Sequence, residues 1–131
     1  MKLRMKSILM LVLASGIMIA TSCKKNDPVV PTVTTSEFVA QQNGSGEGGG
    51  NVTADGDADV TVRGVVIGQT PNPVVTDATV IKTSDGAGTG AFTSKLDAGK
   101  LAPGFTYHVR AYATNSEGTA YGADKTFDVP L

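Results

Sequence analysis

Two adjoining stretches decide the fold, Leu101-Ala102-Pro103-Gly104-Phe105-Thr106-Tyr107 and the alternating segment His108-Val109-Arg110-Ala111-Tyr112-Ala113-Thr114 that follows it. A Leu, a Pro-Gly turn and a Tyr that enters a strand are the layout of a tyrosine corner. In such a corner the ring is buried and the hydroxyl bonds a backbone group a few residues upstream. We therefore expect structural roles for Leu101, Pro103 and Tyr107.

The alternation that follows predicts two faces, because successive side chains of a strand point to opposite sides of the sheet. The side chains expected in the core are Tyr107, Val109, Ala111 and Ala113. Those expected on the outer face are His108, Arg110, Tyr112 and Thr114. An aromatic ring beside charged donors suits a sugar or a protein, so the row His108, Arg110, Tyr112 is a candidate ligand contact. Ordinary cross-strand pairing with Asp124 and its neighbours is the alternative.

The next residues, Asn115-Ser116-Glu117-Gly118-Thr119, predict a hairpin with a three-residue loop and a structural Gly118 at the left-handed position. Pairing Asn115 with Thr119 sets Tyr107 opposite Phe127, Ala111 opposite Ala123 and Arg110 opposite Asp124. Lys125 then falls at an inward position opposite Val109. We expect it to extend to the rim of the core or to occupy a bulge.

The chain from Thr32 onward indicates an all-β protein, because no window shows the apolar spacing of a helix. Runs rich in Val, Thr, Tyr and Phe alternate instead with turn residues. Strands are expected at 31–38, 51–54, 60–67, 79–83, 90–96, 105–115 and 121–129, with a glycine-rich stretch at 41–50 and turns at 55–57, 70–73 and 84–88. Seven short strands at this spacing predict a single two-sheet β-sandwich of the immunoglobulin-like class.

Residues 31–129 resemble the fibronectin type III-like repeats of many surface and secreted proteins of Bacteroidota. The resemblance rests on the stretches 31–35, 50–53, 62–65, 71–73 and 88–94, and most of all on 107–122 (YHVRAYATNSEGTAYG). It implies a fold and a setting rather than a chemistry, since such repeats serve as spacers, adhesion modules and companions of carbohydrate-active domains. The chain departs from the pattern at Val66-Ile67, where these repeats usually carry Cys-Trp, and at Lys125, which is usually apolar.

Residues 1–22 have the layout of a cleaved secretory signal peptide, with Lys2, Arg4 and Lys6 before an apolar run at 7–20. The run is followed by Ala20-Thr21-Ser22-Cys23, which resembles a lipobox, so Cys23 is the expected lipidation site. It is the only cysteine of the chain, and no intrachain disulfide can form. An ordinary secretory signal and a membrane-anchoring helix are the alternatives.

Processing at Cys23 would leave a lipidated tether over residues 23–30 and the domain over 31–131. It removes three of the 11 basic residues and none of the 12 acids, so the mature net charge is −4. That charge gives no footprint for nucleic acid. The second mature residue is Lys24 rather than an acid that would favour inner-membrane retention. We therefore expect a monomer held in the cell envelope, at the outer membrane, by its lipid.

Other chemistries have little support in the residues. The spacing of Asp55, Asp57 and Asp59 suggests a weak calcium loop, but the ligands that an EF-hand needs later in the loop are missing, and a polar turn is the simpler interpretation. The single His108 lacks partners for a catalytic triad, and one His and one lipidated Cys cannot form a zinc centre. We expect no metal, no cofactor and no enzyme activity.

Two functions of different class are compatible with the sequence. One is a lipid-anchored structural or adhesion module at the cell surface with a protein or glycan partner. The other is a glycan- or small-ligand-binding lipoprotein that assists a transporter or hydrolase. The chain has three Tyr, four Phe and no Trp, which weakens the second, because sugar sites commonly use clustered exposed aromatics.

Overall fold

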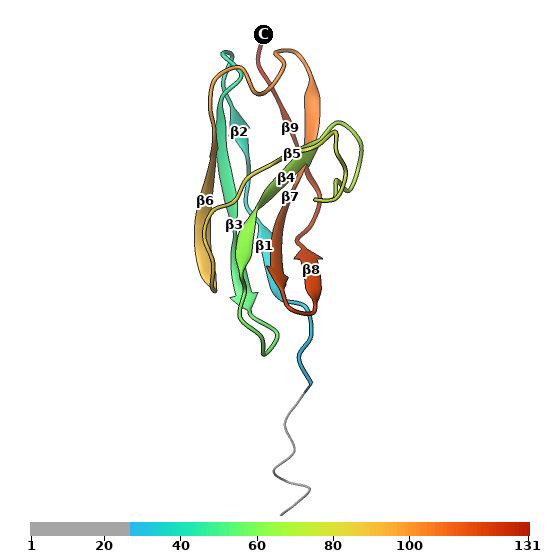
Figure 1. Cartoon of the computed structure of the whole chain (residues 1–131). Helices are drawn as coiled ribbons and strands as arrows, with labels where there is room; N and C mark the ends of the chain where they lie inside the picture. The colour runs from blue at the N-terminus through green and yellow to red at the C-terminus, as the bar shows by residue number, and fades with distance from the viewer. Residues whose placement is uncertain (1–26) are drawn as a thin grey trace, which may run out of the picture.

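The computed structural model describes residues 27–131, so the signal segment and the lipidation site at Cys23 lie outside the described residues. Within this range the chain forms nine strands and no helix (Figure 1). They are β1 (Thr32–Thr35), β2 (Val39–Ala40), β3 (Gly46–Ala54), β4 (Val62–Gly68), β5 (Ile81–Lys82), β6 (Gly90–Leu96), β7 (Thr106–Asn115), β8 (Gly118–Tyr121) and β9 (Lys125–Asp128). No helix of the described part is therefore long and apolar enough to cross a membrane.

The strands form two antiparallel sheets. In the first, which we call sheet A, β1 and β2 pair with successive parts of β3, and β6 pairs with the other side of β3. In the second, sheet B, the order is β5-β4-β7, and β8 and β9 share the free side of β7. The nine segments thus occupy seven strand positions. The expected all-β, fibronectin type III-like sandwich is confirmed.

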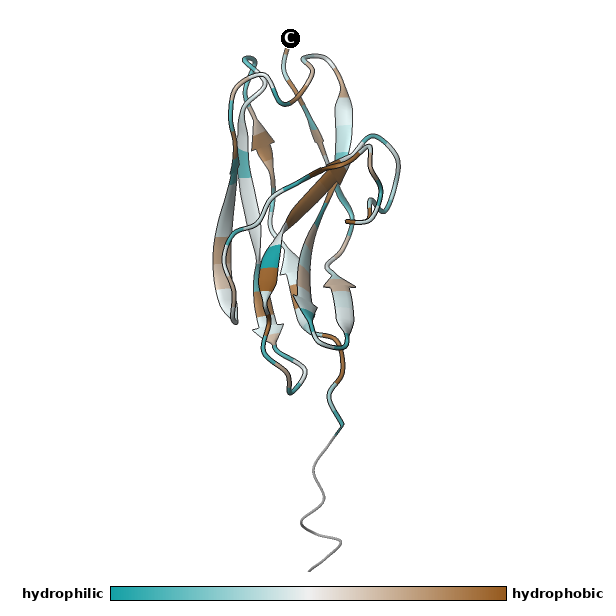
Figure 2. Ribbon diagram, viewed as in Figure 1, coloured by the Kyte–Doolittle hydropathy of each residue, from teal (hydrophilic) through white to brown (hydrophobic). Residues whose placement is uncertain are grey.

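Apolar side chains from both sheets fill the space between them, and the long brown stretch of β4 in Figure 2 is its hydrophobic run, residues 65–67. Val65 and Ile67 of β4 are fully buried there. The residues predicted inward on β7 are all buried: Tyr107, Val109, Ala111 and Ala113. The rings of Phe38 and Phe127 pack together in this core, with centroids 4.5 Å apart. Phe38 thus supplies an aromatic ring to a core that has no Trp.

The glycine-rich stretch proves to be largely strand, because residues 46–50 belong to β3. A Cβ built on Gly46 or Gly48 would lie 2.4 Å from the ring of Phe38. Two inward-facing positions of β3 therefore carry no side chain, and the Phe38 ring occupies the space above them. Glycine has low strand propensity, so the sequence pattern alone did not indicate that β3 begins so early.

The hairpin after β7 differs by one residue from the predicted register. Asn115 pairs with Gly118 rather than with Thr119, which makes a two-residue loop. The later pairs, Tyr107 with Phe127 and Val109 with Lys125, are as predicted. The β7–β8 register is thus shifted by one residue from the β7–β9 register. Residues 122–124, between β8 and β9, contain the extra residue and form a bulge. The pairs expected for Ala123 and Asp124 therefore do not form.

Lys125 follows this bulge and is partly exposed. Its Nζ lies 3.0 Å from a carboxylate oxygen of Glu37 at the surface. The charge thus reaches the rim of the core, as the sequence predicted.

Candidate functional site

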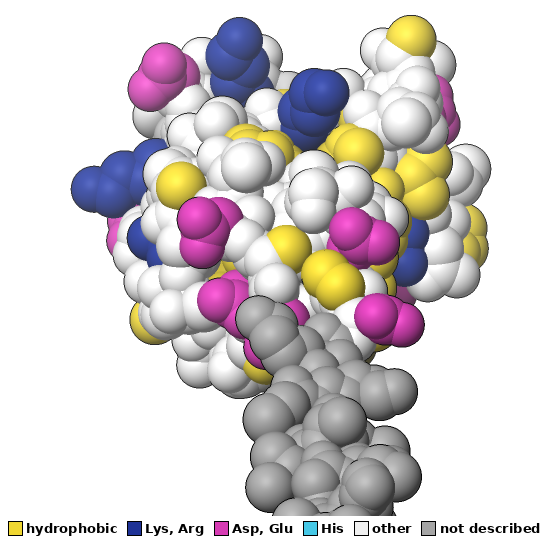
Figure 3. Space-filling view, turned by 60° about the horizontal axis from the view of Figure 1, so that its bottom comes forward, with side chains coloured by type: hydrophobic (Ala, Val, Ile, Leu, Met, Phe, Trp, Pro, Cys, Tyr) yellow, Lys and Arg dark blue, Asp and Glu magenta, His cyan; other side chains and the backbone are white. Residues whose placement is uncertain are grey.

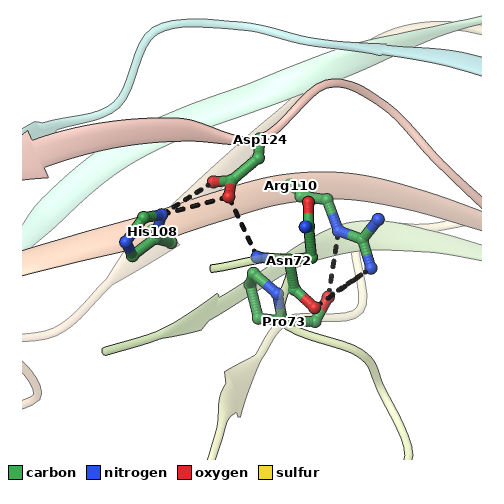
Figure 4. A network of polar contacts seen from close by, with 5 residues as sticks. All are labelled: Asn72, Pro73, His108, Arg110 and Asp124. Carbon is green, nitrogen blue, oxygen red and sulfur yellow. Dashed lines mark hydrogen bonds and ion pairs between the residues drawn. The ribbon is translucent and has the colours of Figure 1, made fainter. Parts of the chain in front are cut away.

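The predicted contact row lies under the connection between β4 and β5. This connection, residues 69–80, is called the β4–β5 loop below, and it folds against the outer face of sheet B (Figure 1). Its turn at 71–73 brings Asn72 and Pro73 close to side chains of β7 and of the bulge (Figure 4). Asn72 has a positive φ of 56°, a conformation that Asn tolerates better than most residues.

His108 is bound to Asp124 rather than left open. Its Nδ1 lies 3.1 Å from a carboxylate oxygen of Asp124, and both side chains are about one-fifth exposed. The same carboxylate accepts a hydrogen bond of 2.9 Å from the backbone N–H of Asn72. Asp124 therefore links β7 to the β4–β5 loop, although the sequence analysis paired it with Arg110.

Arg110 holds the same loop through its guanidinium group. Its Nε and one terminal nitrogen donate to the carbonyl oxygen of Pro73 at 3.0 and 2.8 Å. The guanidinium carbon lies 4.0 Å from the centre of the Tyr121 ring, within the range of a cation–π contact. The Tyr121 hydroxyl accepts a bond of 3.0 Å from the backbone N–H of Val75. Arg110 and Tyr121 thus bind successive parts of one loop.

Tyr112 is buried, and the expectation of an exposed side chain was wrong. Its exposed fraction is 4%, although it does point away from the core. Its hydroxyl donates to the carbonyl oxygen of Thr83, in the segment that follows β5. Burial, and then the charges of Asp85 and Tyr121, raise the pKa of Tyr112 above its ordinary value. The physical reason is tertiary, because residues far along the chain cover this face.

The row His108, Arg110, Tyr112 therefore forms a set of side-chain bonds to loop backbone. Each of the three polar groups has a partner within the chain. This geometry stabilises the β4–β5 loop, and a ligand at the row would have to compete with these bonds. The contacts therefore support a structural role for these three side chains.

The tyrosine corner forms as predicted from Leu101 to Tyr107. The Tyr107 hydroxyl accepts a hydrogen bond of 3.0 Å from the backbone N–H of Ala102. The ring is 6% exposed and stacks at 5.7 Å on that of Phe127. Leu101 is buried beside it, and Pro103 lies in the exposed turn. Gly118 is the first residue of β8 rather than a loop residue, and its φ of +142° is a conformation that residues with a Cβ rarely adopt.

The role of Asn115, at the end of β7, was not predicted from the sequence. Its side chain is buried, and its amide nitrogen donates to the carbonyl oxygens of Val29 and Asp55 at 2.7 and 2.9 Å. Its amide oxygen accepts from the backbone N–H of Glu117 at 2.8 Å. One side chain thus joins the start of the domain, the β3–β4 turn and the β7–β8 hairpin. An Asn between a strand and a polar turn was the available signal.

The acidic turn after β3 lies at this same end of the sandwich. Figure 3 shows acidic side chains at the end of the sandwich where the described chain begins. The carboxylate of Asp55 accepts the backbone N–H of Asp57 at 2.9 Å, as in a polar turn. Over residues 27–131, no group of three acidic, His or Cys side chains converges so as to hold a metal ion.

Sheet A carries an open groove of about 710 Å³ on its outer face. The exposed residues Val39, Glu47, Thr93 and Lys95 are among those that line it. The walls hold acids, one Lys and one exposed Val, but no fully exposed aromatic ring. The groove is therefore shallow and mixed in polarity.

Comparison with known proteins adds little beyond the architecture. No protein-family model matches the chain, and no curated protein matches it. A solved structure titled "Myokine structure" is similar over 80% of this chain and 100% of that chain, at 20% sequence identity and a TM-score of 0.45. The fold assignment rests on the two antiparallel sheets themselves.

Proposed function

We propose that this chain is a lipid-anchored cell-envelope protein, held at the outer membrane through Cys23, that displays one fibronectin type III-like module as a spacer or adhesion element. The observation that carries the proposal is the position of the two ends. The described chain starts at one end of the sandwich, and its carboxyl terminus lies at the opposite end (Figure 1). A module held by residues 23–30 would present its far end outward.

The far end consists of loops joined by backbone bonds. Gly99 donates to Asn43 at 2.9 Å and Leu101 to Gly44 at 3.0 Å, which join the β2–β3 and β6–β7 loops. Gly104 donates to Val129 at 2.8 Å, which adds the carboxyl-terminal segment. The exposed apolar side chains of Phe105 and Leu131 lie in this part of the chain. These loops are the surface that the module would offer to a partner.

The reach of such a display follows from chain geometry. The ten residues of β7 span about 33 Å, since a strand rises about 3.3 Å per residue. The backbone of Val29 is bonded to Gly56 and to Asn115, so the part of the tether before Val29, six residues, adds at most about 20–22 Å when fully extended. The far loops would thus stand up to roughly 55 Å from the lipid, by the same rise per residue.

The anchor is tested by Cys23→Ala in the source cell type or a related host. We expect the wild-type chain in the membrane fraction with a lipid-modified amino terminus at residue 23, measured by mass spectrometry. Cys23→Ala should lose the lipid and leave a soluble or unprocessed product. Ser22→Ala, which keeps the thiol and a small residue before it, should behave like wild type. An unmodified amino terminus at any other residue would contradict the proposal.

The open groove of sheet A favours a second candidate, a glycan- or small-ligand-binding lipoprotein that assists a transporter or hydrolase. Its test is a glycan-array screen of residues 31–131. Binding that is lost on Lys95→Ala would support it, because Lys95 is a cationic side chain on the groove wall. The absence of a fully exposed ring in the lining makes the display function the better supported one.

A further inference from the structure

The edge of sheet A formed by β6 is regular and open. Among residues 27–131, the backbone of β6 hydrogen-bonds to β3 alone. All seven residues from Gly90 to Leu96 pair with β3 without a register shift. Ala91, Thr93 and Lys95 are exposed along it. The strand forms one margin of the sandwich and runs along its long axis (Figure 1).

The other sheet edges of the described chain are interrupted. The opposite edge of sheet A is divided between β1 and β2 and has a register shift at Thr32/Val33. In sheet B, β5 has only two residues, and the β8–β9 edge is broken by the bulge at 122–124. Short edge strands and bulges are the devices by which proteins prevent edge pairing. The β6 edge carries only one such device, the charge of Lys95.

We propose that β6 pairs edge to edge with β6 of a second copy of this chain. Two identical edges related by a two-fold axis run antiparallel, and they then exchange hydrogen bonds symmetrically. A register centred on Thr93 sets Thr93 opposite its own copy and Ala91 opposite Lys95. Lys95 is the only charged residue of β6. In this register the two like charges do not meet, and a Thr–Thr pair, which is favourable across strands, lies at the centre.

The symmetry also decides where the two copies can be anchored. Antiparallel pairing along the long axis turns the second module end over end, so the two tethered ends point in opposite directions. Upright copies on one membrane cannot meet in this way, whereas copies on two facing membranes can. This step rests on the proposed anchoring at Cys23. It makes the edge a contact between cells or vesicles that carry the same protein.

A single contact of this kind is weak. One seven-residue edge is smaller than the two-sided burial of about 1,200–2,000 Å² found in stable complexes. The isolated domain is therefore expected to be monomeric at micromolar concentration, as the sequence analysis predicted. Many copies on two facing surfaces bind together, since effective concentration and avidity multiply weak contacts.

The test couples the chain from Cys23 to Leu131 to vesicles that contain maleimide-lipid, through its only thiol. All described strands lie between Thr32 and Asp128, so this chain contains the whole sandwich. Light scattering then follows vesicle clustering. We expect wild type to cluster, and Thr93→Lys or Thr93→Glu vesicles to cluster at least tenfold more slowly, because like charges meet at the centre of the pair. Mixing the two variant vesicle populations should restore clustering.

The matched control is Thr126→Lys, which puts the same charge on an exposed Thr of the β9 edge. It should leave clustering at the wild-type rate, and circular dichroism checks that every variant is folded. Wild-type vesicles that stay dispersed, Thr93→Lys vesicles that cluster normally, or mixed vesicles that fail to recover would each overturn the proposal. Chemical coupling replaces cellular lipidation, so a failed anchor in the cell would not affect this result.

A second measurement does not depend on added charge. In a Cys23→Ser background, Thr93→Cys should form a disulfide-linked dimer on oxidation at high protein concentration, because opposed residues of antiparallel strands have Cα atoms about 4.5–5.5 Å apart. Thr126→Cys in the same background should remain mainly monomeric. Equal amounts of dimer from the two variants would contradict a specific β6 contact.

Discussion

The hydroxyl of Tyr107 offers the sharpest test of the fold, because Tyr107→Phe removes one oxygen and leaves the ring in place. The stacking on Phe127 at 5.7 Å and the buried surface of the ring are retained. What is lost is the acceptor for the backbone N–H of Ala102, now 3.0 Å from the oxygen. A buried donor without a partner costs about 1–3 kcal/mol, and because this bond is only part-buried the lower half of that range applies. We expect the free energy of unfolding to fall by this amount.

Urea unfolding of residues 31–131 measures the effect. The midpoint should fall while the slope with urea concentration stays unchanged, since the surface exposed on unfolding is the same. In a thermal scan, each kcal/mol should lower the midpoint by about 4–8 °C for a domain of this size. The matched control is Tyr121→Phe, whose hydroxyl also accepts a backbone bond at 3.0 Å. Tyr121 is only partly buried, so water can replace the lost acceptor and the cost should be smaller.

A loss below about 0.5 kcal/mol at Tyr107 would place it among ordinary surface changes and would refute the corner as a stabilising element. A loss at Tyr121 as large as that at Tyr107 would show that burial does not decide the cost.

Four further changes can be made in the same domain. Phe38→Ala should cost about 3–5 kcal/mol, as for other buried aromatics, whereas the exposed Val39→Ala should stay within about 0.5 kcal/mol in the same urea assay. Asn115→Ala, made in the chain 23–131 so that Val29 is present, leaves two carbonyl groups without their donor and should cost about 1–3 kcal/mol, with faster protease cleavage near residue 29 as the local readout. Lys125→Met should be neutral or slightly stabilising by thermal scan, because exposed ion pairs contribute about 0–1 kcal/mol. The raised pKa of Tyr112 means that the unfolded chain loses this proton first as pH rises past about 10. The free energy of unfolding should therefore fall above that pH. If it falls no more steeply with pH in wild type than in Tyr112→Phe, ionisation of Tyr112 is not the cause.

The central strands could be predicted from sequence because their signals are local. β7 alternates strictly between buried and less buried positions up to Ala111, and the Leu-Pro-Gly-Tyr pattern precedes it. β6 was predicted with its observed bounds, 90–96. In both strands, residues close together in the sequence carry the whole pattern, so no knowledge of distant neighbours was needed.

Three features depended on residues far apart in the chain and could not be predicted. Tyr112 is buried because the segment around Thr83 covers it. β3 is a strand despite its glycines because Phe38 fills the space over them. The β7–β8 hairpin has a loop one residue shorter than expected, and the bulge at 122–124 compensates for it, so the register could not be predicted from the hairpin residues alone. In each case a tertiary contact outweighed the local preference.

The packing of the Phe38 ring over the glycines of β3 limits how this sequence can vary. A methyl group at position 46 or 48 would lie 2.4 Å from the Phe38 ring, so neither position can gain a side chain while that ring remains. A smaller residue at 38 alone would leave a cavity in the core. The tolerated route is a pair of changes, a smaller residue at 38 together with Ala or a larger residue at 46 or 48. Related sequences should therefore change these positions together. They should carry an aromatic residue at position 38, or at position 46 or 48, or at none of the three, but not at 38 together with a side chain at 46 or 48.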